Sequence, residues 1–250
     1  MQVPPSTLHA WVGQFAPVCT FSRIRRRLVV GPESVLRSKT FDHQQEYKFA
    51  FHRLKTNLLC KRAFPSIRRY LWDISQNCPN ELFQRSNGAR CSDANLPHLS
   101  LRLVRKETNA QALAKLGLLL AKRSKERHAA IQRFMLVNDS ATVAVEVPVY
   151  LHPHEAPDLE LTGSLTGHID VLQIRSNRVW ILDYKPDARK EKHAKYQIYL
   201  YARALSVRTG IPLRRFAMAY FDDRDYLEVS IESPNVNAVR SYVSVAKNAV

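Results

Sequence analysis

Two aspartates occupy positions in the sequence from which they could bind a cation together. Asp170 lies in the run of residues 165–174, and Asp183 lies in the run of residues 178–184. Both runs are rich in β-branched and aromatic residues, and Ser176-Asn177 between them is typical of a hairpin turn. We therefore expect two antiparallel strands across which the two carboxylates approach each other.

The chemistry available to such a pair is that of a metal-dependent phosphodiesterase. Two carboxylates in otherwise apolar strands repel each other unless a cation lies between them, and hard oxygen ligands favour Mg²⁺ or Mn²⁺. Lys185 follows Asp183 by two residues, so both side chains should point to the same face of the strand. A lysine there could orient or deprotonate a water molecule and stabilise the charge on a five-coordinate phosphorus.

Three short motifs follow one another in this part of the chain: Gly167-His168-Ile169-Asp170, then Asp183-Tyr184-Lys185, then Gln197-Ile198-Tyr199-Leu200-Tyr201. Together they resemble the PD-(D/E)xK nuclease superfamily and, within it, the RecB-type exonuclease branch. The resemblance implies that Asp170, Asp183 and the main-chain carbonyl of Tyr184 hold the metal. It makes Lys185 the catalytic lysine and assigns to Gln197 the positioning of substrate or water. Tyr201, one helical turn further on, shares the face of Gln197, where packing is its more common role.

Two residues upstream complete the set that the resemblance implies. The family often has a metal-binding histidine on a helix before the sheet, and His128 matches it. Residues 108–137 have apolar residues at helical spacing and no proline, so we expect one long helix with His128 near its end. Glu146, in the strand expected over residues 141–151, corresponds to a glutamate that supports the site in related sequences.

The order of the expected elements indicates an α/β protein with a restriction-endonuclease-like core. This order is helix, three strands, helix and strand (αβββαβ), which gives a mixed central sheet flanked by helices. The change of apolar period from 2 to 3.6 after Lys185 predicts a strand followed by a helix without reference to any family. The expected core elements are residues 108–137, 141–151, 165–174, 178–185, 190–208 and 214–221, and a strand (225–231) and a helix (234–247) follow.

Before this core, residues 1–100 are predicted to form a basic, mostly helical N-terminal region. Helical spacing of apolar residues extends over residues 41–62 and 65–76, while residues 1–40 contain several helix breakers. Residues 86–97 are rich in turn-forming residues and mark a boundary. We therefore expect two domains, the N-terminal region 1–100 and a nuclease domain 101–250.

The formal net charge of +16 is concentrated in the N-terminal part of the chain. Residues 1–110 contain 18 Lys and Arg against 7 Asp and Glu, whereas residues 151–250 contain 14 against 12. A surplus of this size attracts phosphate backbones and makes nucleic acid the expected partner. The resemblance implies that this partner is DNA, either at its ends or as single strands. Aromatic residues interleaved with the basic ones could stack on unpaired bases or belong to the core; they are Phe21, Tyr47, Phe49, Phe51, Tyr70 and Trp72.

Several classes of protein are disfavoured. No apolar run reaches the ~18 residues of a membrane span and no secretory signal is evident, so we expect an intracellular protein without membrane partners. The arginines within residues 23–27 could belong to an organelle-targeting segment or to a basic arm. The four cysteines have no Cys-x-x-Cys spacing, so neither a zinc site nor a disulfide framework is indicated. The iron–sulfur cluster of some RecB-type relatives needs cysteines after the core, and none follows Cys91.

These features predict a Mg²⁺- or Mn²⁺-dependent nuclease, and the resemblance implies an exonuclease-like deoxyribonuclease of the kind used in DNA repair or recombination. Two alternatives remain: a non-catalytic nucleic-acid-binding module that keeps the nuclease fold, and a metal-dependent enzyme of another chemistry on the same scaffold. Asp170, Asp183 and Lys185 favour the enzyme over the module. A binding module has no need of two carboxylates that repel phosphate when no metal is bound.

Overall fold

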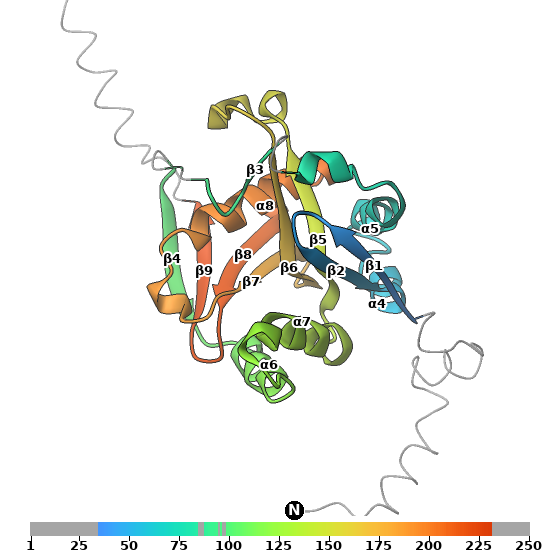
Figure 1. Ribbon diagram of the computed structural model, residues 1–250, viewed down its shortest axis with the longest axis vertical. Coiled ribbons are helices and arrows are strands. Elements are labelled where there is room, and N and C mark those ends of the chain that lie inside the picture. Colours follow the sequence, from blue (N-terminus) through green and yellow to red (C-terminus); the bar gives the residue numbers. More distant parts are fainter. Residues whose placement is uncertain (1–34, 85–87, 95, 97–98, 232–250) are drawn as a thin grey trace, which may run out of the picture. The chain divides into compact units, whose positions relative to one another are not determined.

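A mixed β-sheet is the central feature of the computed structural model (Figure 1). The structure describes residues 35–84, 88–94, 96 and 99–231, and the helix predicted over residues 234–247 lies outside them. Within the described residues, nine strands form the sheet, in the order β1-β2-β5-β6-β7-β8-β9-β4 with β3 paired to β6. The strands are β1 (Leu36–Asp42), β2 (Glu46–His52), β3 (Ala89–Arg90), β4 (Leu101–Lys106), β5 (Thr142–Leu151), β6 (Leu165–Arg175), β7 (Arg178–Tyr184), β8 (Phe216–Phe221) and β9 (Tyr226–Ile231).

The hairpin predicted around Ser176-Asn177 is confirmed. β6 and β7 are antiparallel, with Val171 opposite Leu182. Ser176 and Asn177 have φ values of 50° and 55°, the left-handed conformation that a two-residue turn matched to the twist of the strands requires. The next pair in the register after Val171 and Leu182 is Asp170 and Asp183, so the hairpin brings the two predicted metal ligands together.

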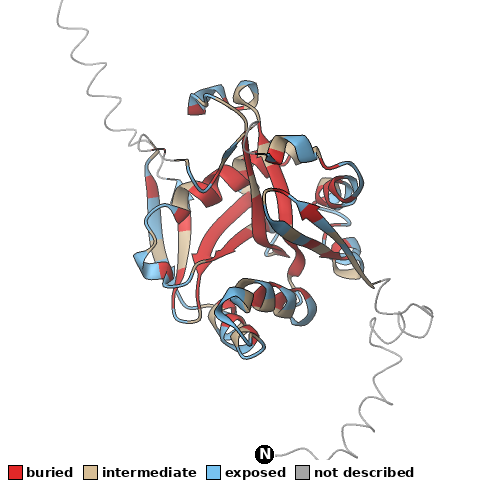
Figure 2. Ribbon diagram, viewed as in Figure 1, coloured by how far each residue is buried: buried red, intermediate tan, exposed pale blue. Residues whose placement is uncertain are grey.

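A helical crossover links β7 to β8, as the parallel pairing of these strands requires. The crossover helix α8 (Ala194–Thr209) packs against strands β5 to β8 and ends at Gly210, whose φ of 68° is common after a helix. Figure 2 shows that these strands and much of α8 are buried. The strands predicted from residue 141 onward are confirmed to within two residues at each end, whereas the helix starts at Ala194 instead of residue 190.

The prediction of a single helix over residues 108–137 is wrong. Two helices, α6 (Asn109–Leu118) and α7 (Arg127–Asn138), lie side by side at one end of the sheet (Figure 1). A Cβ on Gly117 would lie 2.8 Å from the Cα of Ile131, so the missing side chain permits this close contact. The two helices contact each other, and the chain turns between them. His128 therefore lies in the first turn of α7 and not near the end of a long helix.

The prediction of a helix over residues 41–62 is also wrong. The end of β1, the turn after it and β2 account for residues 41–52, and only α4 (Arg53–Leu59) is helical. Phe49 and Phe51 are both buried and two residues apart, which is the spacing of one face of a strand, and β2 pairs with β5. The helix predicted over residues 65–76 is confirmed as α5 (Pro65–Asn77), with its proline in the first turn.

Strands from both sides of the boundary predicted near residue 100 lie in this one sheet. The described residues from Ser38 onward belong to one compact unit, and Phe49 and Leu71 share an apolar core with Val147 and Ile169. The boundary therefore does not separate two hydrophobic cores. That residues 1–100 and 101–250 have distinct roles stays a prediction.

Candidate active site

The predicted site residues converge on one cavity of about 610 Å³. Its walls come from β2, β6, β7, α7 and α8, segments far apart in the sequence. Seven of the eight predicted side chains line it, namely His128, Glu146, Asp170, Asp183, Lys185, Gln197 and Tyr201. The side chain of Tyr184 faces a neighbouring depression between the α6–α7 connection and the segment after β8.

Asp170 is held by groups from two other elements. Its Oδ2 accepts a hydrogen bond from the backbone N–H of Tyr184 at 2.8 Å, across the β6–β7 hairpin. Nε2 of His128, on α7, lies 3.4 Å from the same oxygen. Its Oδ1 accepts a hydrogen bond from Nε2 of Gln132 at 3.2 Å. The carboxylate is therefore fixed in the cavity wall before any ligand arrives.

Asp183 is 2% exposed and lies 2.8 Å, Oδ2 to Nζ, from Lys185. Burial and then the charge of Asp170 raise the pKa of Asp183 to about 7, against the opposing effect of Lys185. Burial alone would lower the pKa of Lys185, but the neighbouring carboxylates, chiefly Asp183, raise it above its usual range. Lys185 is thus an ammonium ion at neutral pH, which suits it to stabilising negative charge and not to removing a proton.

Glu146 lies level with Asp170, because its neighbours Val145 and Val147 pair with Val171 and Ile169. Its φ of 50° is unusual for a residue with a side chain. Burial and then the charge of Asp170 raise the pKa of Glu146 to about 8. Its Oε2 is buried without a hydrogen-bond partner in the described part of the protein. The strand thus delivers a third carboxyl group to the site.

Gln132 also belongs to the site, although it is not among the residues predicted from the sequence. Its Nε2 donates to Oε1 of Glu146 at 2.7 Å and to Oδ1 of Asp170 at 3.2 Å. The amide therefore places one N–H donor group between two carboxyl groups. The available signal was its position four residues after His128, on the same face of a helix.

His128 is held in place by contacts on two sides. Its ring meets the ring of Tyr184 edge to face, with centroids 4.9 Å apart, and its Nε2 faces Asp170. Burial alone would lower the pKa of His128, but the hydrogen bond to Asp170 and its charge raise that pKa above the usual range. Metal ligation by His128, and by the carbonyl of Tyr184, stays a prediction.

The helix motif has a clear packing function. Gln197 donates from Nε2 to the hydroxyl of Tyr201 at 2.6 Å, and both side chains are buried. A Cβ on Gly167 would lie 2.3 Å from Cε1 of Tyr201. Glycine is therefore required three residues before Asp170 if α8 is to pack closely on β6.

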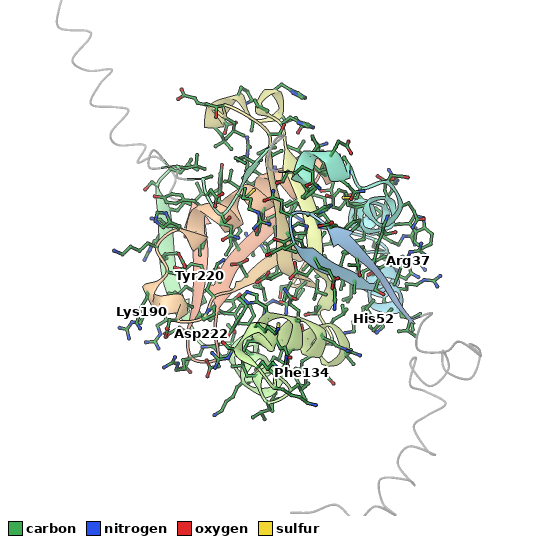
Figure 3. The ribbon with its side chains drawn as sticks, viewed as in Figure 1. Arg37, His52, Phe134, Lys190, Tyr220 and Asp222 are labelled. Atoms are coloured by element: carbon green, nitrogen blue, oxygen red, sulfur yellow. The ribbon has the colours of Figure 1, made fainter. Side chains whose placement is uncertain are left out.

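Asp222 fixes the segment that follows β7 and carries Lys185. It is buried just after β8 (Figure 3), and its Oδ2 accepts a hydrogen bond from the backbone N–H of Ala188 at 2.8 Å. The backbone N–H of Lys185 itself donates to the carbonyl of Phe221 at 2.9 Å. These bonds keep the backbone around Lys185 continuous with the sheet, which limits the positions open to its ammonium group.

The donor set fits a hard divalent cation. Within the described residues, no three His, Cys, Asp or Glu side chains already stand in the arrangement of a metal cage. Three acidic side chains nevertheless share one buried cavity, and Glu146 keeps an unpaired oxygen there. Oxygen donors with surplus negative charge are what Mg²⁺ and Mn²⁺ bind.

Comparison with known proteins supports this assignment. The family model for the PD-(D/E)XK nuclease superfamily matches residues 50–243, which include every predicted site residue. Comparison with the curated proteins and with the solved structures found no match. The mixed sheet flanked by helices agrees with the restriction-endonuclease-like fold of this superfamily.

Members of this superfamily are generally nucleases that use divalent metals, so the expected substrate is a nucleic acid. None of the helices that the structure describes is long and apolar enough to cross a membrane. The family match covers most of the chain, and the hairpin, the lysine and the glutamine helix stand in the order that the motif requires. The chain belongs to the PD-(D/E)XK nuclease superfamily.

Proposed function

We propose that this protein is a Mg²⁺- or Mn²⁺-dependent deoxyribonuclease of the RecB-type branch that removes nucleotides from DNA ends or single strands. The observation that carries the proposal is the meeting of Asp170, Asp183 and Lys185 in one cavity, with Lys185 paired to Asp183. We place this activity in DNA repair or recombination.

The proposed ligands of the cation are Asp170, Asp183, His128 and the carbonyl of Tyr184. The cation, when bound, polarises the scissile phosphate and activates a water molecule. Glu146 supports this set from the adjacent strand, since its unpaired oxygen faces the same buried space.

The other residues act on substrate charge and position. Lys185, held as an ammonium ion, stabilises the negative charge that develops on the phosphate oxygens. Its contact with Asp183 fixes the ammonium group beside the metal ligands. Gln197 orients substrate or water, and its hydrogen bond to Tyr201 limits the rotamers of the amide.

The alternative is a non-catalytic nucleic-acid-binding module that keeps the nuclease fold. The cavity argues against it, because burial and then the charge of Asp170 raise the pKa of Glu146 and of Asp183. Three acidic groups in one cavity would also repel a phosphate backbone. Such a cluster destabilises a protein that only binds nucleic acid. It becomes useful when a cation is to be held against a phosphate.

The test uses purified full-length protein and end-labelled single-stranded DNA, double-stranded DNA and RNA of the same sequence, with Mg²⁺, Mn²⁺ or EDTA. We expect DNA to be shortened from its ends with either metal and not in EDTA. Asp183→Asn should abolish cleavage while the thermal unfolding temperature stays close to that of the wild type. Binding of DNA without cleavage in either metal would support the module instead, and preferential cleavage of RNA would overturn the choice of DNA.

A further inference from the structure

Four rings lie in two stacks beside the acidic cluster. The rings of Tyr47 and His168 are nearly parallel, with centroids 3.6 Å apart and an interplanar angle of 6°. The rings of His43 and Phe83 are stacked at 4.0 Å and 13°. His43 connects the two stacks, since its centroid is 5.1 Å from that of His168. All four side chains line the cavity that contains Asp170 and Asp183.

The two histidines form a rigid base for this arrangement. Nδ1 of His43 lies 2.9 Å from Nε2 of His168, and Nε2 of His43 lies 2.9 Å from Oδ1 of Asn80. His43 is 1% exposed and His168 is 7% exposed. Because both rings are buried and hydrogen-bonded, they hold the ring of Tyr47 in one orientation without being accessible themselves.

Tyr47 is the accessible member of the group. It is half-buried, on β2 at the cavity wall, whereas Phe49, Phe51 and Tyr70, from the same aromatic-rich part of the sequence, are buried in the core. Trp72 is exposed but lines a different depression, with α4 and α5. Among the described members of the aromatic set that the sequence analysis singled out, Tyr47 therefore borders the acidic cluster.

Arg90 places a positive charge beside the Tyr47 ring. Arg90 donates from NH2 to the hydroxyl of Tyr47 at 2.5 Å, and its guanidinium carbon lies 5.7 Å from the ring centroid. Lys48 and Lys125 line the same cavity. An aromatic ring flanked by cationic side chains is the combination that holds a nucleobase and its phosphate in proteins that bind single strands.

The position of the ring relative to the acids fits a neighbouring nucleotide. His168 precedes Asp170 by two residues on β6, about 7 Å along a strand. A phosphate at Asp170 and Asp183 would therefore have the base of an adjoining nucleotide near the stacked pair. A base inside a duplex has both of its faces covered by neighbouring bases, so only an unpaired or frayed base could lie on Tyr47.

We propose that Tyr47, stacked on His168 and flanked by Arg90, is the platform on which one unpaired nucleobase of the substrate strand stacks. The inference rests on the proposed nuclease function for the identity of its ligand and narrows the substrate to single strands or frayed ends. Arg90 contacts the phosphate of the stacked nucleotide and holds the tyrosine hydroxyl at the same time.

The test measures binding in EDTA, where no cleavage occurs, by fluorescence anisotropy of a short labelled single strand. Tyr47→Ala should weaken binding about tenfold or more, as expected for the loss of one stacked base. Tyr47→Phe, which keeps the ring, should bind nearly as the wild type does. Trp72→Ala is the matched control, because it removes an exposed aromatic side chain outside the cavity.

A series of strands in which one base at a time is missing locates the contact. For one position in the series, the strand that lacks its base should bind the wild type more weakly. Tyr47→Ala should not weaken the binding of that strand any further. The proposal is overturned if folded Tyr47→Ala, checked by circular dichroism and thermal unfolding beside Tyr47→Phe, binds all strands as the wild type does. If binding depends on Tyr47 but no metal-dependent cleavage occurs, the stacking platform is supported and the nuclease function is rejected. If cleavage occurs but binding does not depend on Tyr47, the nuclease function is supported and the stacking platform is rejected.

Discussion

At the scale of single residues, the site is a cluster of acids whose charge is balanced by N–H donors. Gln132 contacts Glu146 and Asp170, Lys185 contacts Asp183, and His128 contacts Asp170. Each donor occupies an oxygen that a cation would also use. Metal binding therefore competes with these contacts, and removing a donor should act differently from removing a carboxylate.

The acids should make the metal-free protein less stable as the pH rises. The pKa of Glu146 is about 8 in the folded protein and about 4.3 in the unfolded chain. The folded state therefore binds the proton more tightly, and protonation of Glu146 stabilises the protein. This stabilisation is complete below about pH 4 and is lost as the pH rises through about 8. Asp183, with a folded pKa of about 7, acts in the same direction.

Chemical denaturation in EDTA between pH 5 and 8.5 measures this effect. The free energy of unfolding of the wild type should lose about 1–3 kcal/mol more over this range than that of Glu146→Gln, which keeps the acceptor for Gln132 and cannot ionise. Mg²⁺ should restore part of the loss at high pH in the wild type. Equal pH profiles of the two proteins would show that Glu146 is ionised throughout.

Lys185→Met should separate metal binding from turnover. The ammonium group stabilises charge on the phosphate and competes with the cation for Asp183, so its loss should lower kcat about 100-fold or more without weakening metal binding. Single-turnover cleavage and calorimetric titration with Mn²⁺ check the two quantities. Weaker Mn²⁺ binding by the variant would mean that Lys185 organises the metal ligands instead.

His128→Ala should have the opposite profile. Loss of a nitrogen ligand should raise the metal concentration required for half-maximal cleavage, and more so for Mn²⁺ than for Mg²⁺, because Mn²⁺ accepts imidazole more readily. The rate at saturating metal should fall less than it does in Lys185→Met. An unchanged metal requirement would assign His128 to holding Asp170 and Tyr184 and not to ligation.

At the scale of elements, the contact between β6 and α8 decides where the helix lies over the acids. Gly167→Ala should destabilise the protein by about 1–3 kcal/mol and lower cleavage, because the new Cβ would overlap Cε1 of Tyr201. Gly163→Ala is the matched control, since nothing lies within 4 Å of its Cβ position. Thermal unfolding of both variants checks this, and equal stability would mean that α8 can shift without cost.

The elements that could be predicted from the sequence are those whose pattern is local. The β6–β7 hairpin followed from strand alternation around Ser176-Asn177, and its register brought Asp170 and Asp183 together. The elements that were missed depend on tertiary partners. β2 has its burial pattern because it pairs with β5, and α6 and α7 separate because Gly117 allows them to pack on each other.

The site shows the same division between local and tertiary information. Lys185 and Asp183 could be paired from a two-residue spacing, since both lie on one face of a strand. Gln132 and Arg90 could not be chosen, and Tyr47 could be named only as one of six aromatic residues, because each reaches the cavity from an element whose position depends on the packing of the sheet. Their residue types are common on protein surfaces, and no motif distinguishes them.

At the scale of the whole molecule, the described residues within 38–100 belong to the same compact unit as the residues that line the acidic cavity. Removal of residues 1–100 would take away β1, β2, α4 and α5, along with the buried side chains of Phe49 and Leu71. Such a truncation should not fold, so it cannot test where DNA binds. Substitutions in the full chain are needed to assign the positive charge to a function.

Four arginines, Arg23, Arg25, Arg26 and Arg27, offer that test. Replacing all four with alanine should weaken binding of single-stranded DNA in EDTA and reduce the slope of log affinity against log salt by up to about 3, since each phosphate contact contributes about 0.7. Thermal unfolding and cleavage at saturating DNA should change little, because the proposed metal ligands and Lys185 are left in place. Binding is measured by anisotropy over a salt series.

An unchanged salt slope in that variant would indicate that the phosphate contacts lie at the rim of the cavity, where Lys48, Arg90 and Lys125 lie near the acids. Cations at the rim would hold the nucleotides next to the scissile bond, so Lys125→Ala should then reduce both the salt slope and kcat/KM. Cations far from the acids would instead retain the strand without affecting the rate at saturation. The two outcomes distinguish a protein that concentrates DNA near its site from one that positions each nucleotide within it.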